Sequence, residues 1–244
     1  MSLVPKEPSP PSVRMSDYTW HFYGPPGVGK TTLCNQFRKP IFIATESGTE
    51  AMWAAAAPAS NWTELKAIIA ELAEGDHDYE TVVLDTADIA YNLCETYVCE
   101  ANGWTDVADG ECGRGWRTLN REWTNMITQL RMLPMCTVLI GHEKKEILKE
   151  KLGSRMVETG MYRVTTALPN SARQTLHSAV DFIIRCEFTP DNERILRTQP
   201  VENNRERVDA KARGHEGATL PETLEMSFES LYEAFKKTLG NTKE

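Results

Sequence analysis

Short apolar runs alternate with segments of helical periodicity along most of this 244-residue chain. Residues 41–45 (IFIAT), 81–85 (TVVLD) and 136–141 (CTVLIG) are almost continuously apolar, which is typical of strands buried on both faces of a parallel sheet. Strands are also predicted at residues 18–23, 179–188 and 194–198.

Segments in which apolar residues recur at helical spacing separate these runs. The apolar side chains of residues 63–74 fall on one helix face, and Thr63 is a suitable N-cap for that helix. Further helices are predicted over residues 31–37, 117–133 and 228–239. Strands that alternate with helices predict an α/β fold with a mostly parallel central sheet flanked by helices.

The first 16 residues differ from the rest of the chain. Four prolines, together with serine and charges of both signs, predict a disordered tail over residues 1–16. We expect residues 17–240 to form a single domain, because a chain of this length can bury one substantial core.

Composition and charge are those of a soluble globular protein, with 41% hydrophobic and 25% charged residues. The net charge of −8 argues against a uniformly basic nucleic-acid binder, although a local basic channel is compatible with it. The sequence has neither a run of about 18 apolar residues nor the apolar core of a signal peptide, so a cytoplasmic protein without a membrane span is expected.

Residues 24–31 read GPPGVGKT, which fits the GxxxxGK[ST] pattern of a phosphate-binding loop. Its glycines let successive backbone N–H groups face phosphate oxygens, and Lys30 can reach the β- and γ-phosphates. Helix onset at Lys30 adds the positive end of a helix dipole. The predicted nucleotide-binding residues are Gly24, Pro25, Pro26, Gly27, Val28, Gly29, Lys30, Thr31 and Thr32. The sequence therefore predicts a protein that binds a nucleoside triphosphate, with ATP and Mg²⁺ as expected cofactors.

Two oxygen ligands for Mg²⁺ are predicted. The Thr31 hydroxyl follows the loop lysine, and Asp85 ends a buried strand about fifty residues later. Asp88 is the competing acid, but its position favours a cap on the following helix.

Glu46 and His142 each follow a predicted strand, and parallel strands bring such residues to one sheet edge. Glu46 can polarise the water that attacks the γ-phosphate, or it is a solvated loop acid. His142 can contact the γ-phosphate, or it is a capping histidine.

Residues 143–155 (EKKEILKEKLGSR) predict either a solvated helix face or the edge of a mobile basic loop that contacts phosphates. The six cysteines include no CxxC pair, so a zinc site that uses Cys94, Cys99 and Cys112 is only an alternative to buried or surface thiols.

The order GPPGVGKT, a strand ending at Glu46, VVLDTAD and VLIGHE resembles the core of RecA-type ATPases. This resemblance implies that Glu46 is the catalytic base and that Asp85 holds Mg²⁺. The γ-phosphate sensor position, commonly Gln in that family, is His142 here. DAKARGH is similar to a basic motif that RecA-like filaments insert into the neighbouring ATP site, which implies that Lys211 and Arg213 act in trans.

The chain looks most like the short phage-encoded RecA-like ATPases of the Sak family, which serve in strand annealing and recombination. This implies action on single-stranded DNA, a single-strand-binding protein partner and a homo-oligomer, either ring or filament, in the host cytoplasm. DNA-binding loops are expected near residues 101–115 and 144–170. Candidates for base stacking and phosphate contact are Trp104, Trp116, Tyr162, Arg114, Arg155 and Arg163.

Two other classes of P-loop protein remain open. A small-molecule kinase would use an Arg-rich lid, for which GRGWR at residues 113–117 is a thin candidate. A motor or helicase-loader ATPase of another branch would use ATP as an assembly switch. The position of Glu46 favours hydrolysis over transfer to a metabolite.

Overall fold

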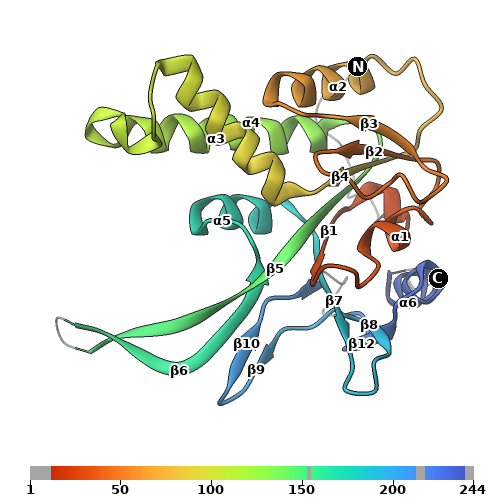
Figure 1. Ribbon diagram of the computed structural model, residues 1–244. Coiled ribbons are helices and arrows are strands. Elements are labelled where there is room, and N and C mark those ends of the chain that lie inside the picture. The colour runs from red at the N-terminus through yellow and green to blue at the C-terminus, as the bar shows by residue number, and fades with distance from the viewer. Residues whose placement is uncertain (1–11, 153–154, 213–217, 240–244) are drawn as a thin grey trace, which may run out of the picture.

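The computed structural model describes residues 12–152, 155–212 and 218–239, and it has helices on both faces of a large sheet (Figure 1). Its strands are β1 (Thr19–Gly24), β2 (Pro40–Ala44), β3 (Ala55–Pro58), β4 (Thr81–Asp85), β5 (Cys136–Leu152), β6 (Arg155–Thr166), β7 (Phe182–Phe188), β8 (Arg194–Arg197), β9 (Val201–Glu202), β10 (Glu206–Val208), β11 (Lys211–Ala212) and β12 (Thr223–Glu225). Its α-helices are α1 (Lys30–Cys34), α2 (Trp62–Glu74), α3 (Ala87–Asn102), α4 (Arg114–Met132), α5 (Asn170–Ala179) and α6 (Phe228–Leu239).

The sheet is parallel at its centre. Its main path has the order β12-β8-β7-β1-β5-β4-β2-β3, in which the neighbours from β7 to β3 pair in parallel and β8 and β12 pair antiparallel. The predicted α/β architecture, a mostly parallel sheet flanked by helices, is thereby confirmed. The strand β1, which leads into the phosphate loop, lies between β5 and β7.

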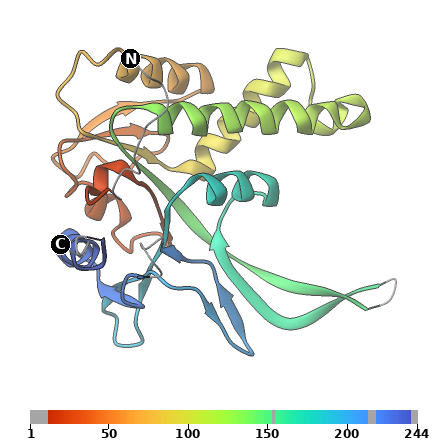
Figure 2. The same cartoon turned by 180° about the vertical axis from the view of Figure 1, so that it is seen from behind.

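Helices cover both faces of the sheet (Figures 1 and 2). One apolar core lies on each face. On one face, α2 to α5 cover a cluster that includes Trp62 and Trp123. On the other face, α1 and α6 cover a cluster that includes Trp20, Phe182 and Phe235. The Trp20 and Phe182 rings stack with their centroids 4.0 Å apart. Because both faces are covered, all six residues of β1 are buried, which explains why the central strands are nearly continuous apolar runs.

Several predicted boundaries were wrong, and the helix expected over residues 117–133 begins three residues earlier, at Arg114. The helix expected over residues 31–37 ends at Cys34, because the chain tightens there into turns such as Gln36 N to Leu33 O, 3.1 Å. The N-cap of α2 is Asn61 rather than Thr63, since its side chain accepts a hydrogen bond from Glu64 N at 2.9 Å. The first residue of the strand expected over 179–188 instead ends α5, and β7 begins at Phe182.

The largest departure is in the described part of residues 143–155, which forms neither a helix nor a basic loop. The strand β5 continues to Leu152 and pairs antiparallel with β6, which forms a long two-stranded hairpin that extends from the body of the protein (Figures 1 and 2). The strand pairing brings opposite charges together across the hairpin, as it does for Lys149 and Glu158 at 3.8 Å.

Residues 12–16 of the expected disordered tail lie against the domain. Met15 is buried, and its carbonyl oxygen accepts a hydrogen bond from Trp20 Nε1 at 3.1 Å. Residues 1–11 lie outside the described part of the chain. Among the described helices, none is long and apolar enough to cross a membrane.

Candidate nucleotide-binding site

The phosphate loop joins the end of β1 to the start of α1. Gly27 and Gly29 have φ angles of 75° and 105°, in the left-handed region that favours glycine. Gly24 approaches the next strand so closely that a Cβ atom would lie 2.2 Å from the Cys186 carbonyl oxygen. The loop can therefore curl and keep its backbone N–H groups toward one hollow, as phosphate binding requires.

Lys30 lies across this loop. Its Nζ donates hydrogen bonds to the carbonyl oxygens of Gly24 and Pro25, each at 3.0 Å. Burial lowers the pKa of the ammonium group, and the acids at Asp85, Asp88 and Glu46 act in the opposite direction. A buried cation placed among carboxylates and backbone carbonyls can exchange these partners for phosphate oxygens.

The structure brings Thr31 and Asp85 together. Thr31 Oγ1 donates to Asp85 Oδ2 at 2.8 Å, below the phosphate loop. Asp85 is buried, which raises its pKa, while the Thr31 hydrogen bond and the Lys30 charge lower it. The adjoining Thr45 hydroxyl holds the strand end, since it lies 3.1 Å from the Asp85 and Thr86 carbonyl oxygens.

This donor set fits Mg²⁺. A hydroxyl and a carboxylate are hard oxygen ligands, and Mg²⁺ usually takes one or two protein ligands together with water and substrate phosphates. In the described ranges, no group of three or more His, Cys, Asp and Glu residues could hold a metal ion by itself. The alternative zinc site therefore has no support, and Cys94 and Cys99 are buried while Cys112 is exposed.

Asp88, His142 and Glu46 form an array of contacts near Thr31 and Asp85. His142 Nδ1 lies 2.8 Å from Asp88 Oδ2, and His142 Nε2 lies 3.6 Å from Glu46 Oε1. Asp88 does not act as the helix cap that its position predicted, because its other carboxylate oxygen accepts from the His142 backbone N at 3.0 Å. The N-cap position of α3 is occupied by Thr86 instead. His142 thus links an acid of α3 to the loop acid Glu46.

Electrostatics in the array follow from these contacts. The hydrogen bond with Asp88 raises the pKa of His142, with the Asp88 and Glu46 charges acting in the same direction. Burial raises the pKa of Glu46, and the His142 charge opposes this. A carboxylate with a raised pKa and one histidine contact has the chemistry of a general base for water.

We expect a pH-dependent contribution of His142 to stability. Because its pKa in the folded state is raised, the contact stabilises the fold fully below the unfolded pKa of about 6.5, and the contribution is lost as the pH rises through the folded pKa. The difference in the free energy of urea unfolding between wild type and His142→Gln should therefore shrink from pH 6 towards pH 8.5. A difference in unfolding free energy that stays constant between pH 6 and pH 8.5 would contradict the raised pKa of His142.

Lys211 is not brought to this site within the described chain. Lys211 lies on β11, and its Nζ donates to the His177 carbonyl oxygen at 3.0 Å, at the end of α5. Arg213 lies outside the described residues.

The expected DNA-contacting side chains are scattered. Trp104 packs against the core, whereas Trp116 and Tyr162 are exposed by 46% and 49%. Arg114 and Arg155 are exposed, and Arg163 is held by Asp209, with Nη2 to Oδ2 at 2.8 Å.

Arg194, which was not among the predicted site residues, lies over the phosphate loop. Its Nη1 lies 3.6 Å from the position that a Cβ atom on Gly29 would occupy. No motif surrounds this residue, so only the pairing of β8 with β7 could have located it.

Comparison with known proteins gives the family. Residues 16–213 match the family AAA_24, described as an AAA domain. The chain is 25% identical over 130 residues to the SPbeta prophage-derived uncharacterized protein YorG of Bacillus subtilis (strain 168), a match that spans 51% of this chain and only 40% of that protein. The crystal structure of the RadB recombinase is similar with a TM-score of 0.45 and 17% identity, over 80% of this chain and 91% of that chain. Because the family match covers well over half of its length, the chain belongs to the AAA_24 family of AAA domains.

Proposed function

We propose that this protein is a Mg²⁺-dependent ATP hydrolase of RecA-like type that acts on single-stranded DNA. The observation that carries the proposal is the Thr31–Asp85 hydrogen bond of 2.8 Å below a complete phosphate loop. This pair joins the two halves of a nucleotide site that lie 54 residues apart in the sequence. Membership of an AAA domain family supports the nucleotide part of the proposal.

Each residue has a distinct role in this reaction. Lys30 and the loop N–H groups bind phosphate oxygens, while Thr31 and Asp85 would hold the Mg²⁺. When bound, Mg²⁺ neutralises charge on the β- and γ-phosphates. Glu46 orients and deprotonates the attacking water, and His142 holds the Glu46 carboxylate in position through its 3.6 Å contact.

Contact with single-stranded DNA is proposed for one face of the β5–β6 hairpin. The register pairs Ile147 with Tyr162 and Lys151 with Met156, so these four side chains share a face. Lys149 belongs to the same face, and all five residues are exposed. Two lysines, of which Lys149 is paired with Glu158 on the same face, lie near an exposed aromatic ring and suit phosphate contact and base stacking.

The experiment is ATP turnover with and without single-stranded DNA. We expect stimulation in the wild type, and Tyr162→Ala should weaken DNA binding by about tenfold, since base stacking on an aromatic ring contributes on that order. Basal turnover without DNA should be unchanged. Tyr232→Ala on α6, which removes another exposed tyrosine, is the matched control. Wild-type turnover that is insensitive to single-stranded DNA would contradict this part of the proposal.

The proposed function also includes assembly of several copies of this chain. A homo-oligomer, ring or filament, would let Lys211 and Arg213 supply positive charge to a neighbouring ATP site. The prophage origin of the Bacillus relative supports a phage-type role, of the kind that Sak-family ATPases have in annealing with a single-strand-binding protein.

The small-molecule kinase is the weaker candidate. Its lid would be GRGWR, which lies around the start of α4 beyond the far end of α3 (Figure 1). The helix α3 has 16 residues, which makes it about 24 Å long, and it begins beside Asp85. The lid would therefore need a large movement to reach the phosphates. A helicase loader remains distinguishable, because its turnover would respond to a protein partner rather than to DNA.

A further inference from the structure

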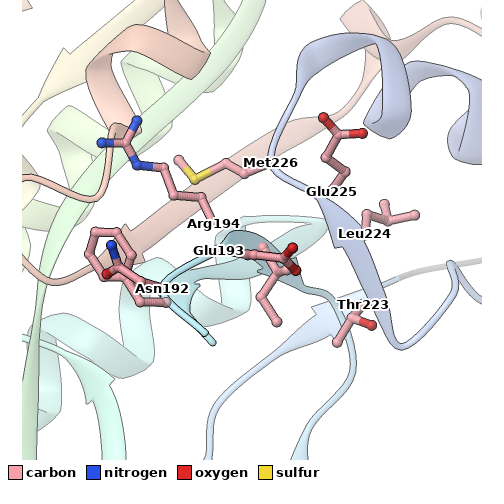
Figure 3. Close-up of a pocket in the computed structure, with 9 residues that line it drawn as sticks. Asn192, Glu193, Arg194, Thr223, Leu224, Glu225 and Met226 are labelled. Atoms are coloured by element: carbon pink, nitrogen blue, oxygen red, sulfur yellow. The ribbon is translucent and has the colours of Figure 1, made fainter. Parts of the chain in front are cut away.

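A cleft of about 780 Å³ lies next to the phosphate loop, between the turn that joins β7 to β8 and the junction of β12 with α6. Phe188 lines it from the first segment. Asn192 and Arg194 line it from the same segment, and Glu225 and Met226 line it from the second (Figure 3). The two walls are tied together by a hydrogen bond from Met226 N to Arg194 O at 3.2 Å. Its size is in the range of small-ligand pockets.

Two side chains that line the cleft reach the phosphate loop. Arg194 Nη1 lies 3.6 Å, and Met226 Cε 3.7 Å, from the position that a Cβ atom on Gly29 would occupy. In Figure 3, the Arg194 guanidinium and the Met226 thioether lie close together at one end of the cleft. A phosphate chain held by the loop would therefore have one end at the mouth of this cleft.

The sheet order indicates which end of the phosphate chain faces the cleft. Asp85, Glu46 and His142 follow or belong to β4, β2 and β5, on one side of β1. The cleft is built from β7, β8 and β12, on the other side. If the terminal phosphate faces the acids, the nucleoside must leave the loop on the cleft side.

We propose that the nucleoside of the bound triphosphate occupies this cleft, with its base against the Phe188 ring and Arg194 at the junction of ribose and phosphates. The inference rests on the proposed function, because it needs a triphosphate in the loop. Phe188 is exposed by 39% at the end of β7, so a flat ring face is accessible to a base.

The Arg194 side chain is suited to bind at the junction of the ribose and the phosphates. Within the described ranges, its guanidinium has neither an acidic partner nor a hydrogen bond, and its nearest aromatic contact is Phe188, 5.9 Å from the ring centroid. An exposed guanidinium without a carboxylate partner keeps its five donors for an incoming ligand. Its planar group can stack on a base and bind phosphate oxygens at the same time.

The test compares two probes, the non-hydrolysable imido analogue of ATP and inorganic tripolyphosphate, by calorimetric titration with Mg²⁺. We expect the wild type to bind the analogue at least about tenfold more tightly than tripolyphosphate, since stacking of a base contributes on that order. Phe188→Leu, which keeps an apolar side chain but removes the ring, should weaken only the analogue, by about five- to tenfold. Arg194→Ala should weaken both probes.

Controls separate this inference from the proposed function. Arg205→Ala removes another exposed arginine, between β9 and β10, and should change neither affinity. If Phe188→Leu leaves the affinity for the analogue unchanged while Lys30→Ala abolishes it, the nucleotide site stands and the cleft assignment is overturned. If the wild type does not bind the analogue, or binds it equally well after Lys30→Ala, the proposed function itself fails.

Discussion

Lys30→Ala is expected to reduce ATP turnover by about 100-fold or more, because loss of a single preorganised donor to a reacting phosphate has effects of that size. The ammonium group is buried within the phosphate loop, where its bonds of 3.0 Å to Gly24 O and Pro25 O place it next to the loop N–H groups. The remaining loop has no other side-chain cation to replace it. Equilibrium titration with labelled ATP should show the loss of binding directly.

The fold should survive this substitution. Two hydrogen bonds are lost, each with a net contribution of about 1 kcal/mol, but the cost of burying an ammonium group is removed with them. The circular dichroism spectrum of Lys30→Ala should match that of the wild type, and its thermal unfolding should remain cooperative. Lys237→Ala, at an exposed lysine of α6, is the matched control and should hydrolyse ATP like the wild type. Normal turnover by folded Lys30→Ala would contradict the assignment of the phosphate loop.

The elements that were predicted correctly are those in which local pattern and tertiary environment agree. The strand β4 matches its predicted bounds because its apolar residues are buried on both faces. The phosphate loop could be recognised because its glycines meet a local demand, namely positive φ at Gly27 and Gly29. Asp85 could be placed beside Thr31 because parallel strands end at one sheet edge, and the 2.8 Å contact agrees with this.

The features that were missed depend on partners distant in the sequence. The alternating charges after His142 fit a helix and a strand equally well, and only the pairing with β6 decides between them. Asp88 was expected to be a helix cap, because its position in the sequence carries no information about His142, 54 residues away. Arg194 reaches Gly29 only through the sheet order, in which β8 lies two strands from β1.

Glu46 is the residue for which a loss of chemistry can best be separated from a loss of binding. It follows β2, and its carboxylate contacts His142 Nε2 at 3.6 Å, whereas the proposed Mg²⁺ ligands are Thr31 and Asp85. In the proposed reaction Glu46 lies on the water side of the γ-phosphate, and its neutral isostere should leave the phosphate and metal contacts in place. Asp85→Asn, in contrast, should weaken Mg²⁺-dependent binding as well.

Glu46→Gln is expected to lower the turnover number by about 100-fold or more while the affinity for ATP stays within about threefold of wild type, because only proton acceptance is removed. Single-turnover hydrolysis and equilibrium binding of ATP, measured on the same preparation, separate the two quantities. Glu74→Gln at the exposed end of α2 is the control for loss of one carboxylate, and it should change neither. His142→Gln should have a smaller effect than Glu46→Gln, since His142 acts by positioning the carboxylate. Hydrolysis by Glu46→Gln at the wild-type rate would show that another group activates the water, and a parallel loss of ATP affinity would instead place Glu46 among the residues that hold the phosphates and Mg²⁺.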